Sequence, residues 1–371
     1  MRTLITADAL GGVWHYATTL AITLAERHAV HVLLVTCGQA PSTDQLSVLQ
    51  NAGRGRSVQV EHEHIDAPLE WQHAEKEQYR QLREAVLTMA LNWRASIIHA
   101  NEHHFGEIGN TGMPVVVVSH SDLCSWEAAV HAKAPAVVEE QYVQRVRAGL
   151  ENASLVIAPS AFVAGSLSRW YGFSGVVRVL PHGVQEAEVT GRQPRTVDAM
   201  MAGRLWDEGK NAHCFERAVE GLATGVYAAA GPLQGPGAAF VPASDRLSYT
   251  GALAHQELRA LFSQSKLFVS PALYDPFGLV VVEAALAGCG LILADIASYR
   301  QLWGDTAVYF PPNEPLALRR IIQVILHDPE SQQRLAHAAG EHARALYSAD
   351  RMAEAYLATY QRIAIRHGVA P

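Results

Sequence analysis

The chain has 371 residues, of which 49% are hydrophobic and 18% are charged, which predicts a globular protein of two or three domains. The formal net charge of −7 argues against a nucleic-acid partner, because such partners are usually bound by a basic face. Four widely spaced cysteines without a C-x-x-C pattern, a start that reaches Asp8 too soon for a signal peptide, and no apolar run of about 18 residues together predict a cytoplasmic protein.

Short β-branched runs alternate with helical stretches along the chain, which predicts parallel βα units. In the first half we expect strands at Arg2–Thr6, Val30–Thr36, Val58–His62, Ile97–Ala100, Val115–Ser119, Leu155–Ala158 and Val176–Leu180. In the second half we expect strands at Ala199–Ala202, Val226–Ala230, Leu247–Thr250, Leu267–Ser270, Leu291–Ala294 and Val308–Phe310. Helices are expected from near Val13, over Glu75–Trp93 and from Asp328 onward, and the Gly- and Pro-rich residues Gly231–Pro242 predict a loop.

These two arrays predict an α/β protein with two Rossmann-like, doubly wound parallel-sheet domains that face a cleft. The irregular, polar residues between His182 and Thr196 are typical of an interdomain linker. We therefore expect an N-terminal domain at 1–182, a second domain at 183–345 and a final helix at 346–371. Ligands of such sheets bind at the carboxyl ends of the strands, so the cleft is the expected site.

The first candidate ligand-binding segment is Asp8–Tyr16, which follows the first strand and opens a helix. Gly11 and Gly12 would let a phosphate approach the helix amides closely, although a tight βα turn explains the same glycines. The dinucleotide pattern G-x-G-x-x-G is absent, which argues against a nicotinamide enzyme.

The strand Val115–Ser119 leads directly into His120, which is a candidate ligand or a capped histidine at a strand end. Trp126 lies close behind and is a candidate for stacking on a sugar ring or for the core. The other conspicuous histidines, His62 with His64 and His103 with His104, show no zinc spacing, so we expect polar or surface histidines there.

Two cations follow the first strand of the second half, in the segment Ala202–Asn211. Arg204 offers a planar fork and Lys210 a mobile point charge, and both suit a diphosphate group that gains negative charge. The alternative is a plain loop with surface salt bridges.

The most informative stretch is Tyr274–Ala285, in which an acid, a Pro, an aromatic residue and a Gly precede an apolar run with one Glu. The run predicts a buried helix over Leu279–Leu286, whose first amides would be free to hold an anion. Gly278 lets a ligand approach the backbone. Glu283 lies about one turn into this helix and needs a partner there; a core helix with a hydrogen-bonded Glu is the alternative.

These segments, each placed after a predicted strand, resemble the motifs of retaining glycosyltransferases of family 4 (glycosyl transferases group 1, GT-B fold) over nearly the whole chain. Asp275, in place of the usual Glu, and Glu283 resemble the acid-x7-Glu signature of that family. Ile157–Ser160 and Leu180–Val184 resemble its two elements near the hinge, with His182 in place of the usual Asn. The resemblance implies that the final helix packs back on the N-terminal domain.

The resemblance also implies site residues. The catalytic set would be His120, Asp275, Arg204 and Lys210. The donor-binding set would be Gly11, Gly12, Gly203, Leu253, Phe277, Gly278, Leu279 and Glu283. The acceptor-side set would be Trp14, Asn101 and Trp126.

The implied activity is transfer of a sugar, with retention of anomeric configuration, from a nucleotide diphosphate donor to a hydroxyl of a saccharide or lipid-linked glycan, in polysaccharide synthesis. UDP-glucose is the first choice of donor and GDP-mannose the second. No D-x-D motif follows a suitable strand, so we expect no metal and no cofactor beyond the donor substrate. The implied mechanism is front-face attack assisted by the leaving group.

Three alternatives stay open: a GT-B-like phosphorylase, a GT-B-like epimerase, and a non-catalytic scaffold that binds nucleotide sugar. The helix over Glu75–Trp93 carries Lys76, Arg80 and Arg83, with Arg94 near its end, and could make weak peripheral contact with a membrane. A solvated charged face is the preferred interpretation of these residues.

Overall fold

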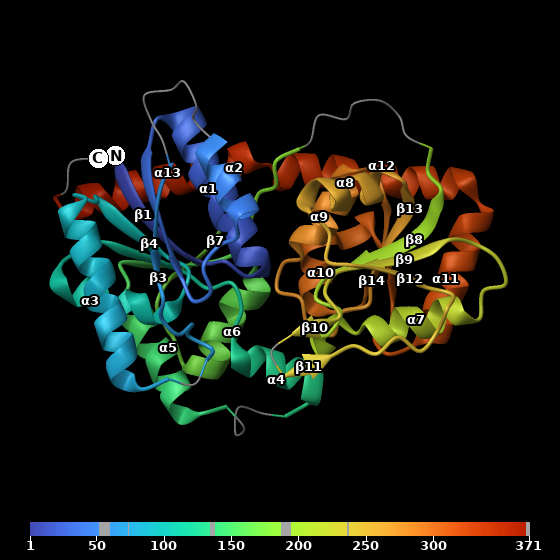
Figure 1. The fold of residues 1–371 in the computed structure, drawn as a ribbon, viewed down its shortest axis with the longest axis horizontal. Helices are drawn as coiled ribbons and strands as arrows, with labels where there is room; N and C mark the ends of the chain where they lie inside the picture. Colours follow the sequence, from blue (N-terminus) through green and yellow to red (C-terminus); the bar gives the residue numbers. More distant parts are fainter. Residues whose placement is uncertain (52–59, 73, 134–137, 187–193, 236, 369–371) are drawn as a thin grey trace. The chain divides into compact units, whose positions relative to one another are not determined.

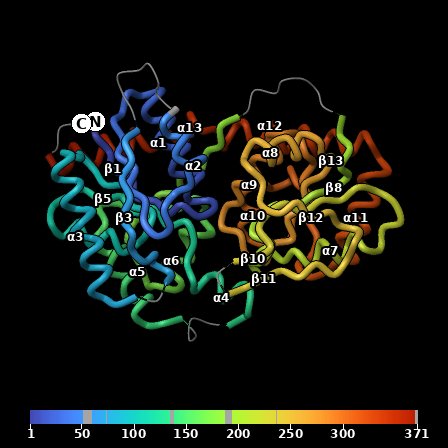
Figure 2. The backbone as a smooth tube through the Cα atoms, in the orientation of Figure 1, coloured from blue at the N-terminus to red at the C-terminus, as the bar shows by residue number. Residues whose placement is uncertain are grey.

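The computed structural model describes residues 1–51, 60–72, 74–133, 138–186, 194–235 and 237–368, which form two compact units (Figures 1 and 2). The first unit comprises Met1–Glu127, Ala134–Gln185 and Ser348–Pro371, and the second comprises Ala128–Lys133 and Glu186–Tyr347. Besides the short segment Ala128–Lys133, the chain passes from the first unit to the second after Gln185 and returns after Tyr347.

The first unit is built on a seven-stranded parallel sheet with the strand order β3-β2-β1-β4-β5-β6-β7. Its strands are β1 (Arg2–Asp8), β2 (His31–Cys37), β3 (Val60–Ile65), β4 (Ile97–Ala100), β5 (Val115–Val118), β6 (Leu155–Ala158) and β7 (Val177–Val179). The order reverses between β1 and β4, where Ile5 pairs with His99. Ligands of open parallel sheets bind outside the carboxyl ends of the strands at such a reversal.

Helices cover both faces of this sheet (Figure 1). They are α1 (Gly11–His28), α2 (Thr43–Asn51), α3 (Lys76–Asn92), η1 (His103–Thr111), α4 (Leu123–His131), α5 (Glu140–Asn152), α6 (Ala161–Tyr171) and α13 (Ala349–Arg366). α13, from the end of the chain, packs against α1. The continuous β-branched strands are buried because both faces of a parallel sheet are covered, as in the Val115–Val118 strand.

The second unit contains a six-stranded parallel sheet with the order β12-β9-β8-β13-β14-β15 and a short hairpin, β10–β11. The strands are β8 (Val197–Ala202), β9 (Tyr227–Ala230), β10 (Gln234–Gly235), β11 (Ala238–Ala239), β12 (Ser248–Gly251), β13 (Ser265–Ser270), β14 (Gly290–Ala294) and β15 (Val308–Phe310). The order reverses between β8 and β13, so the carboxyl ends of these two strands are the expected ligand site of this unit.

Helices flank the second sheet in two layers, with α7 and α11 packed together on one side and α8, α9 and α12 on the other (Figure 1). Their bounds are η3 (Glu208–Lys210), α7 (Ala212–Glu220), α8 (His255–Ser263), α9 (Leu279–Leu286), α10 (Ala297–Trp303), η4 (Gly304–Thr306), α11 (Pro315–His327) and α12 (Pro329–Leu346).

The predicted α/β architecture of two doubly wound parallel sheets is confirmed, and the predicted strands agree with the structure to within two residues at most ends. The expected loop Gly231–Pro242 was wrong in part, because it holds the β10–β11 hairpin. No individual positions were predicted for α2, α4, α5, α6, α7, α10 and α11. The first two residues of the expected Val58–His62 strand and much of the expected linker lie outside the described residues.

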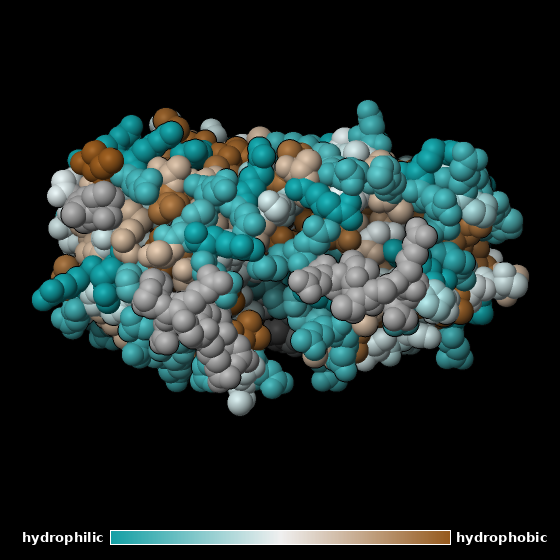
Figure 3. All heavy atoms as spheres, turned by 90° about the horizontal axis from the view of Figure 1, so that it is seen from above, coloured by the Kyte–Doolittle hydropathy of each residue, from teal (hydrophilic) through white to brown (hydrophobic). Residues whose placement is uncertain are grey.

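In the described part of the chain, no helix has the length and hydropathy that crossing a bilayer requires. In the view of Figure 3, hydrophilic residues predominate and hydrophobic ones form small separate groups. On α3, Arg80 pairs with Glu77 and Glu84, and Arg83 lies 3.3 Å from Glu107. The Arg80 pairs are half-exposed, whereas Arg83 and Glu107 are largely buried.

Candidate functional site

The carboxyl ends of the first-unit strands gather a set of histidine, asparagine and tyrosine side chains. Asn101 follows β4, His120 follows β5 and His182 follows β7, while His99 lies within β4. The ring of Tyr16, from α1, packs against His120 and His182 with centroid distances of 4.7 and 4.3 Å. Residues from four elements thus meet at one edge of the sheet.

Hydrogen bonds join these side chains into a continuous chain. His120 Nε2 lies 2.7 Å from Asn101 Oδ1, and His120 Nδ1 lies 3.1 Å from His182 Nε2. On the other side, His99 Nε2 lies 3.0 Å from the same Asn101 oxygen. The candidate residues Asn101 and His120 are therefore in direct contact.

Burial keeps these imidazoles neutral. It lowers the pKa of His99 to about 4. Burial, reinforced by His99, lowers the pKa of His182 to about 3, and burial with the neighbouring histidines lowers that of His120 well below its usual range. His120 is therefore a neutral hydrogen-bonding group at physiological pH.

The other candidate residues of the first unit differ in their exposure to solvent. Gly11 is exposed at the start of α1 with φ of +64°, a conformation that favours glycine, and Gly12 is exposed beside it. Leu10 precedes them without a side-chain cap, so the first amides of α1 lack an intrahelical acceptor. Trp14 is only 4% exposed and packs in the core, whereas Trp126 is half-buried on α4.

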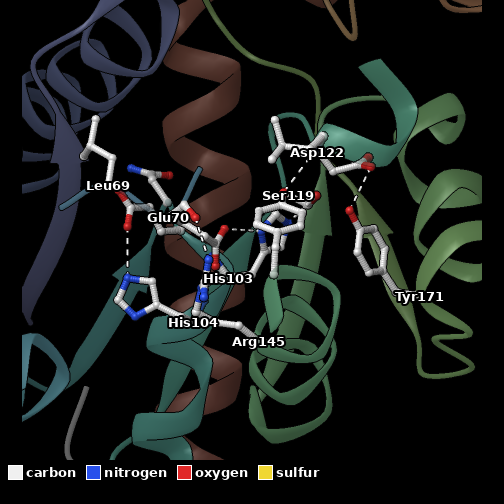
Figure 4. Close-up of polar contacts among 12 residues, drawn as sticks. Leu69, Glu70, His103, His104, Ser119, Asp122, Arg145 and Tyr171 are labelled. Atoms are coloured by element: carbon white, nitrogen blue, oxygen red, sulfur yellow. Dashed lines mark hydrogen bonds and ion pairs between the residues drawn. The ribbon is translucent and has the colours of Figure 1, made fainter. Parts of the chain in front are cut away.

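Asp122 has a structural role beside this site. Its carboxylate accepts hydrogen bonds from the amide and hydroxyl of Ser125, at 2.8 and 2.6 Å, and from the hydroxyl of Ser166 at 3.2 Å. It also accepts from the hydroxyl of Tyr171 at 2.9 Å (Figure 4). The carboxylate thereby caps the start of α4 and ties it to α6.

A second buried cluster in this unit centres on Glu70, in the turn before α3 (Figure 4). Glu70 Oε2 lies 2.6 Å from His103 Nδ1, and His103 Nε2 lies 2.8 Å from Ser119 Oγ. The Glu70 carboxylate also accepts from the amides of His103 and His104, at 3.2 and 2.8 Å. Ser119 is fully buried and directly precedes His120, so this cluster supports the end of β5.

The charges in the Glu70 cluster are set by burial and by contact. Burial alone would raise the pKa of Glu70, but the charge and hydrogen bond of His103 lower it to about 2. Burial opposes a charge on His103, yet Glu70 raises its pKa. Burial, followed by the charge of Glu70, raises the pKa of Glu102 to about 8. Glu70 and His103 therefore form a buried ion pair.

The sequence interpretation missed this cluster. His103 and His104 were expected as polar or surface histidines, and the surface part of that expectation was wrong because both are buried. The pairing of His103 with His104 in the sequence was the signal that could have drawn attention to it. Their partner Glu70 stands in a stretch without a recognisable motif.

In the second unit, both candidate cations follow β8. Arg204 Nη2 lies 2.7 Å from Asp207 Oδ2, and the arginine side chain is 52% exposed while the aspartate is buried. Asp207 also accepts from the amide of Gly209 at 2.9 Å and so caps η3, which carries Lys210. Gly203, with φ of +151°, precedes Arg204. One buried carboxylate thus positions both the exposed guanidinium and the turn that holds the lysine.

Lys210 contacts the acid that follows β13. Its Nζ lies 2.9 Å from Asp275 Oδ2, which also accepts from the Tyr299 hydroxyl at 2.9 Å. Tyr299 is fully buried, and burial followed by Asp275 raises the pKa of its hydroxyl well above its usual value. Strands β8 and β13 are neighbours, so the predicted residues Lys210 and Asp275 meet where the strand order reverses.

Helix α9 has the predicted bounds. At its start, some of the main-chain amides that were expected to be free have no acceptor within the helix, and one has a side-chain acceptor. Gly278 adopts φ of +79° directly before the helix, and no side chain among the described residues caps it. The amide of Phe277, which we expected to be free, lies 3.4 Å from Asp275 Oδ1. The amides at the start of the helix lack intrahelical acceptors and carry the positive end of its dipole.

Glu283 has the partner that its position demands. Its Oε1 lies 3.0 Å from His255 Nε2 on α8, and the Glu283 side chain is 10% exposed. The predicted residue Leu253 is half-buried in the turn just before α8. These contacts place Glu283 and the segment after β12 side by side.

The described residues contain no group of three or more His, Cys, Asp or Glu side chains arranged to hold a metal ion. Within the second unit, the charged groups after β8 and the helix start after β13 instead form a site with the chemistry to bind a phosphorylated ligand.

Two doubly wound sheets with these groups at their strand reversals define an α/β protein of the GT-B fold. Two family models match the chain: "Glycosyltransferase Family 4" over residues 10–188 and "Glycosyl transferases group 1" over residues 238–342. The chain belongs to this family of group 1, family 4 glycosyltransferases.

Individual relatives agree with this assignment. The chain is 38% identical to a glycogen synthase from Mycobacterium tuberculosis over 93 residues, a match that spans 24% of this chain and 22% of that relative. A sucrose-phosphate synthase from Thermosynechococcus elongatus superposes with a TM-score of 0.80 at 21% identity, over 99% of this chain and 100% of that one. HepE from Anabaena, in complex with UDP-glucose, superposes with a TM-score of 0.75 at 18% identity, over 98% and 100% of the two chains. The two superpositions show the shared fold.

Proposed function

We propose that the protein is a retaining glycosyltransferase that transfers a sugar from a nucleotide diphosphate donor, UDP-glucose in the first place, to a hydroxyl of a saccharide or lipid-linked glycan in polysaccharide synthesis. The observation that carries the proposal is the convergence of Arg204, Lys210 and the start of α9 at the reversal between β8 and β13. Two cations and a helix N-terminus match the charge of a diphosphate.

The proposed chemistry follows from these groups. As the bond between sugar and diphosphate breaks, negative charge grows on the leaving group, and Arg204, Lys210 and the α9 dipole stabilise it electrostatically. These fixed charges lead us to propose a reaction that requires no metal or cofactor. Asp275 holds Lys210 in place and is available to the hydroxyls of the donor sugar.

Two further observations support parts of this proposal. HepE, which shares the fold, is described in complex with UDP-glucose, and this supports UDP-glucose as the first donor to test. All four cysteines are unpaired and buried, which fits a reducing, cytoplasmic compartment.

Replacing Glu283 by alanine tests the donor site. In the proposed complex the Glu283 carboxylate binds the ribose hydroxyls, so its loss is expected to weaken UDP binding by about 10- to 100-fold, the effect of a hydrogen bond to a charged group. Isothermal titration calorimetry measures the affinity. The control is Glu341→Ala, because Glu341 pairs with Arg344 on the exposed face of α12. Equal UDP affinity of Glu283→Ala and wild type would show that Glu283 is only a core residue.

A further inference from the structure

The hydrogen bonds around His120 extend to the last helix of the chain. Tyr360, on α13, places its hydroxyl 2.5 Å from His99 Nδ1. The sequence Tyr360, His99, Asn101, His120 and His182 is therefore one unbroken series of side-chain contacts, which we name the His120 chain. All five residues belong to the first unit.

Asn101 sets the direction of the two hydrogen bonds that its Oδ1 makes in the His120 chain. Its Nδ2 donates to the main-chain oxygen of Thr6 at 2.6 Å, which leaves Oδ1 as the atom that faces the histidines. A carbonyl oxygen only accepts hydrogen bonds. Both His99 Nε2, at 3.0 Å, and His120 Nε2, at 2.7 Å, must therefore carry a hydrogen. The Tyr16 hydroxyl, 3.4 Å from His99 Nε2, is a second acceptor for the first of these.

The remaining ring nitrogens follow from neutrality. A neutral imidazole with a hydrogen on Nε2 has a lone pair on Nδ1. The Tyr360 hydroxyl therefore donates to His99 Nδ1, and His182 Nε2 donates to His120 Nδ1 at 3.1 Å. Burial lowers the pKa values of all three histidines, which agrees with the neutral forms.

We propose that Asn101 and Tyr360 are positioning residues that fix His120 as the Nε2–H tautomer, so that His120 accepts a hydrogen bond at Nδ1 from a substrate hydroxyl that replaces His182 there. This inference rests on the proposed function and on the family resemblance, which places His120 in the catalytic set. His120 is half-buried, whereas Tyr360 is fully buried and acts on the substrate only through the chain. The lone pair on Nδ1 of a neutral imidazole accepts a hydrogen bond, so it favours a substrate hydroxyl, which can donate, over a group that can only accept.

Tyr360→Phe is the variant that isolates this role. The phenyl ring keeps the packing against His99, at a centroid distance of 6.0 Å, and removes only the hydroxyl that donates to Nδ1. His99 then no longer has a donor that favours its Nε2–H tautomer. A His99 ring with its lone pair on Nε2 would repel Asn101 Oδ1, and this repulsion would weaken the contact between Asn101 and His120. The matched control is Tyr79→Phe, which loses hydroxyl contacts to the main-chain oxygens of Leu69 and Gln72 outside the His120 chain.

The experiment combines ¹⁵N NMR of histidine-labelled protein without ligand with steady-state transfer kinetics from UDP-glucose. In wild type we expect hydrogen on His120 Nε2 and not on Nδ1. In Tyr360→Phe we expect a mixture of tautomers at His99 and a kcat about 5- to 10-fold lower, the effect of weakening one hydrogen bond, with UDP affinity unchanged. Tyr79→Phe should keep the wild-type tautomer and kcat.

A hydrogen on His120 Nδ1 in wild type, or a wild-type kcat in folded Tyr360→Phe, would overturn the inference. If Tyr360→Phe does not fold, Asn101→Asp carries the test: its carboxylate favours protonated imidazoles, so His120 should titrate at higher pH, and an unchanged titration would overturn the inference. The NMR measurement needs no substrate, so it determines the tautomer of His120 even if the wild-type protein transfers no sugar. A lack of transfer by wild type would count against the proposed function and not against this inference.

Discussion

Replacing Arg204 by alanine is expected to lower turnover of the nucleotide-sugar donor by about 10²- to 10³-fold, which is the usual cost of removing one group that stabilises charge in a transition state. The guanidinium is half-exposed and held at 2.7 Å by the buried Asp207, so it is fixed in direction yet accessible to a ligand. Because the charge on the diphosphate grows as the sugar departs, the loss should fall mainly on kcat and less on donor affinity. Measuring the rate of UDP release checks this.

The control for Arg204→Ala is Arg334→Ala. Arg334 is 61% exposed and pairs with Glu330 at 2.6 Å on α12, so its loss removes an arginine and a salt bridge without touching the strand ends. Circular dichroism establishes that both variants fold. Near-normal UDP release by a folded Arg204→Ala protein would refute the assignment of Arg204 to the diphosphate.

Replacing Glu70 by alanine is expected to lower the free energy of unfolding by about 3–5 kcal/mol, as when one partner of a buried ion pair is removed. The change leaves His103 buried without its counter-ion and removes the acceptor of two main-chain amides. Urea unfolding measures the loss. The control is Glu77→Ala on α3, because Glu77 is a half-exposed partner of Arg80 and should cost only about 0–1 kcal/mol. Similar losses in both variants would show that the Glu70–His103 pair contributes no more than a surface pair.

The same ion pair predicts a pH dependence of stability. The pKa of Glu70 is lowered from 4.5 to about 2, so its contribution is complete above pH 4.5 and is lost as the pH falls through the folded pKa. The pKa of His103 is raised from 6.5, so its contribution is complete below pH 6.5 and is lost as the pH rises through the folded pKa. Glu70→Gln keeps the shape of the side chain but removes its charge. The difference in the free energy of unfolding between wild type and Glu70→Gln should therefore be largest between pH 4.5 and pH 6.5.

Much of the fold was predictable from local sequence. Helix α9 was placed at its observed bounds because Pro276 and Gly278 mark its start and an apolar run follows. The β10–β11 hairpin was not predicted, because strands of two residues are too short for a periodic pattern to identify.

The candidate site was predictable where its residues stand in one segment and less so elsewhere. Lys210 and Asp275 were both expected, and the structure shows them in contact. Their shared partner Tyr299 was not expected, because it comes from α10, outside any motif. Likewise, Tyr360 reaches His99 across 261 positions of sequence, a distance over which composition and spacing carry no information.

The measurement that tests the central claim most directly is a thermal-shift comparison of the protein with UDP, GDP, ADP and their common sugar conjugates, with and without Mg²⁺. A ligand present at about 100 times its Kd stabilises the folded state by about 2.7 kcal/mol, which for a chain of this length corresponds to a shift of roughly 3–4 °C. We predict such a shift for UDP and UDP-glucose, independent of Mg²⁺. Melting temperatures that stay unchanged with every nucleotide and every conjugate would contradict the proposal that this protein binds a nucleotide-sugar donor.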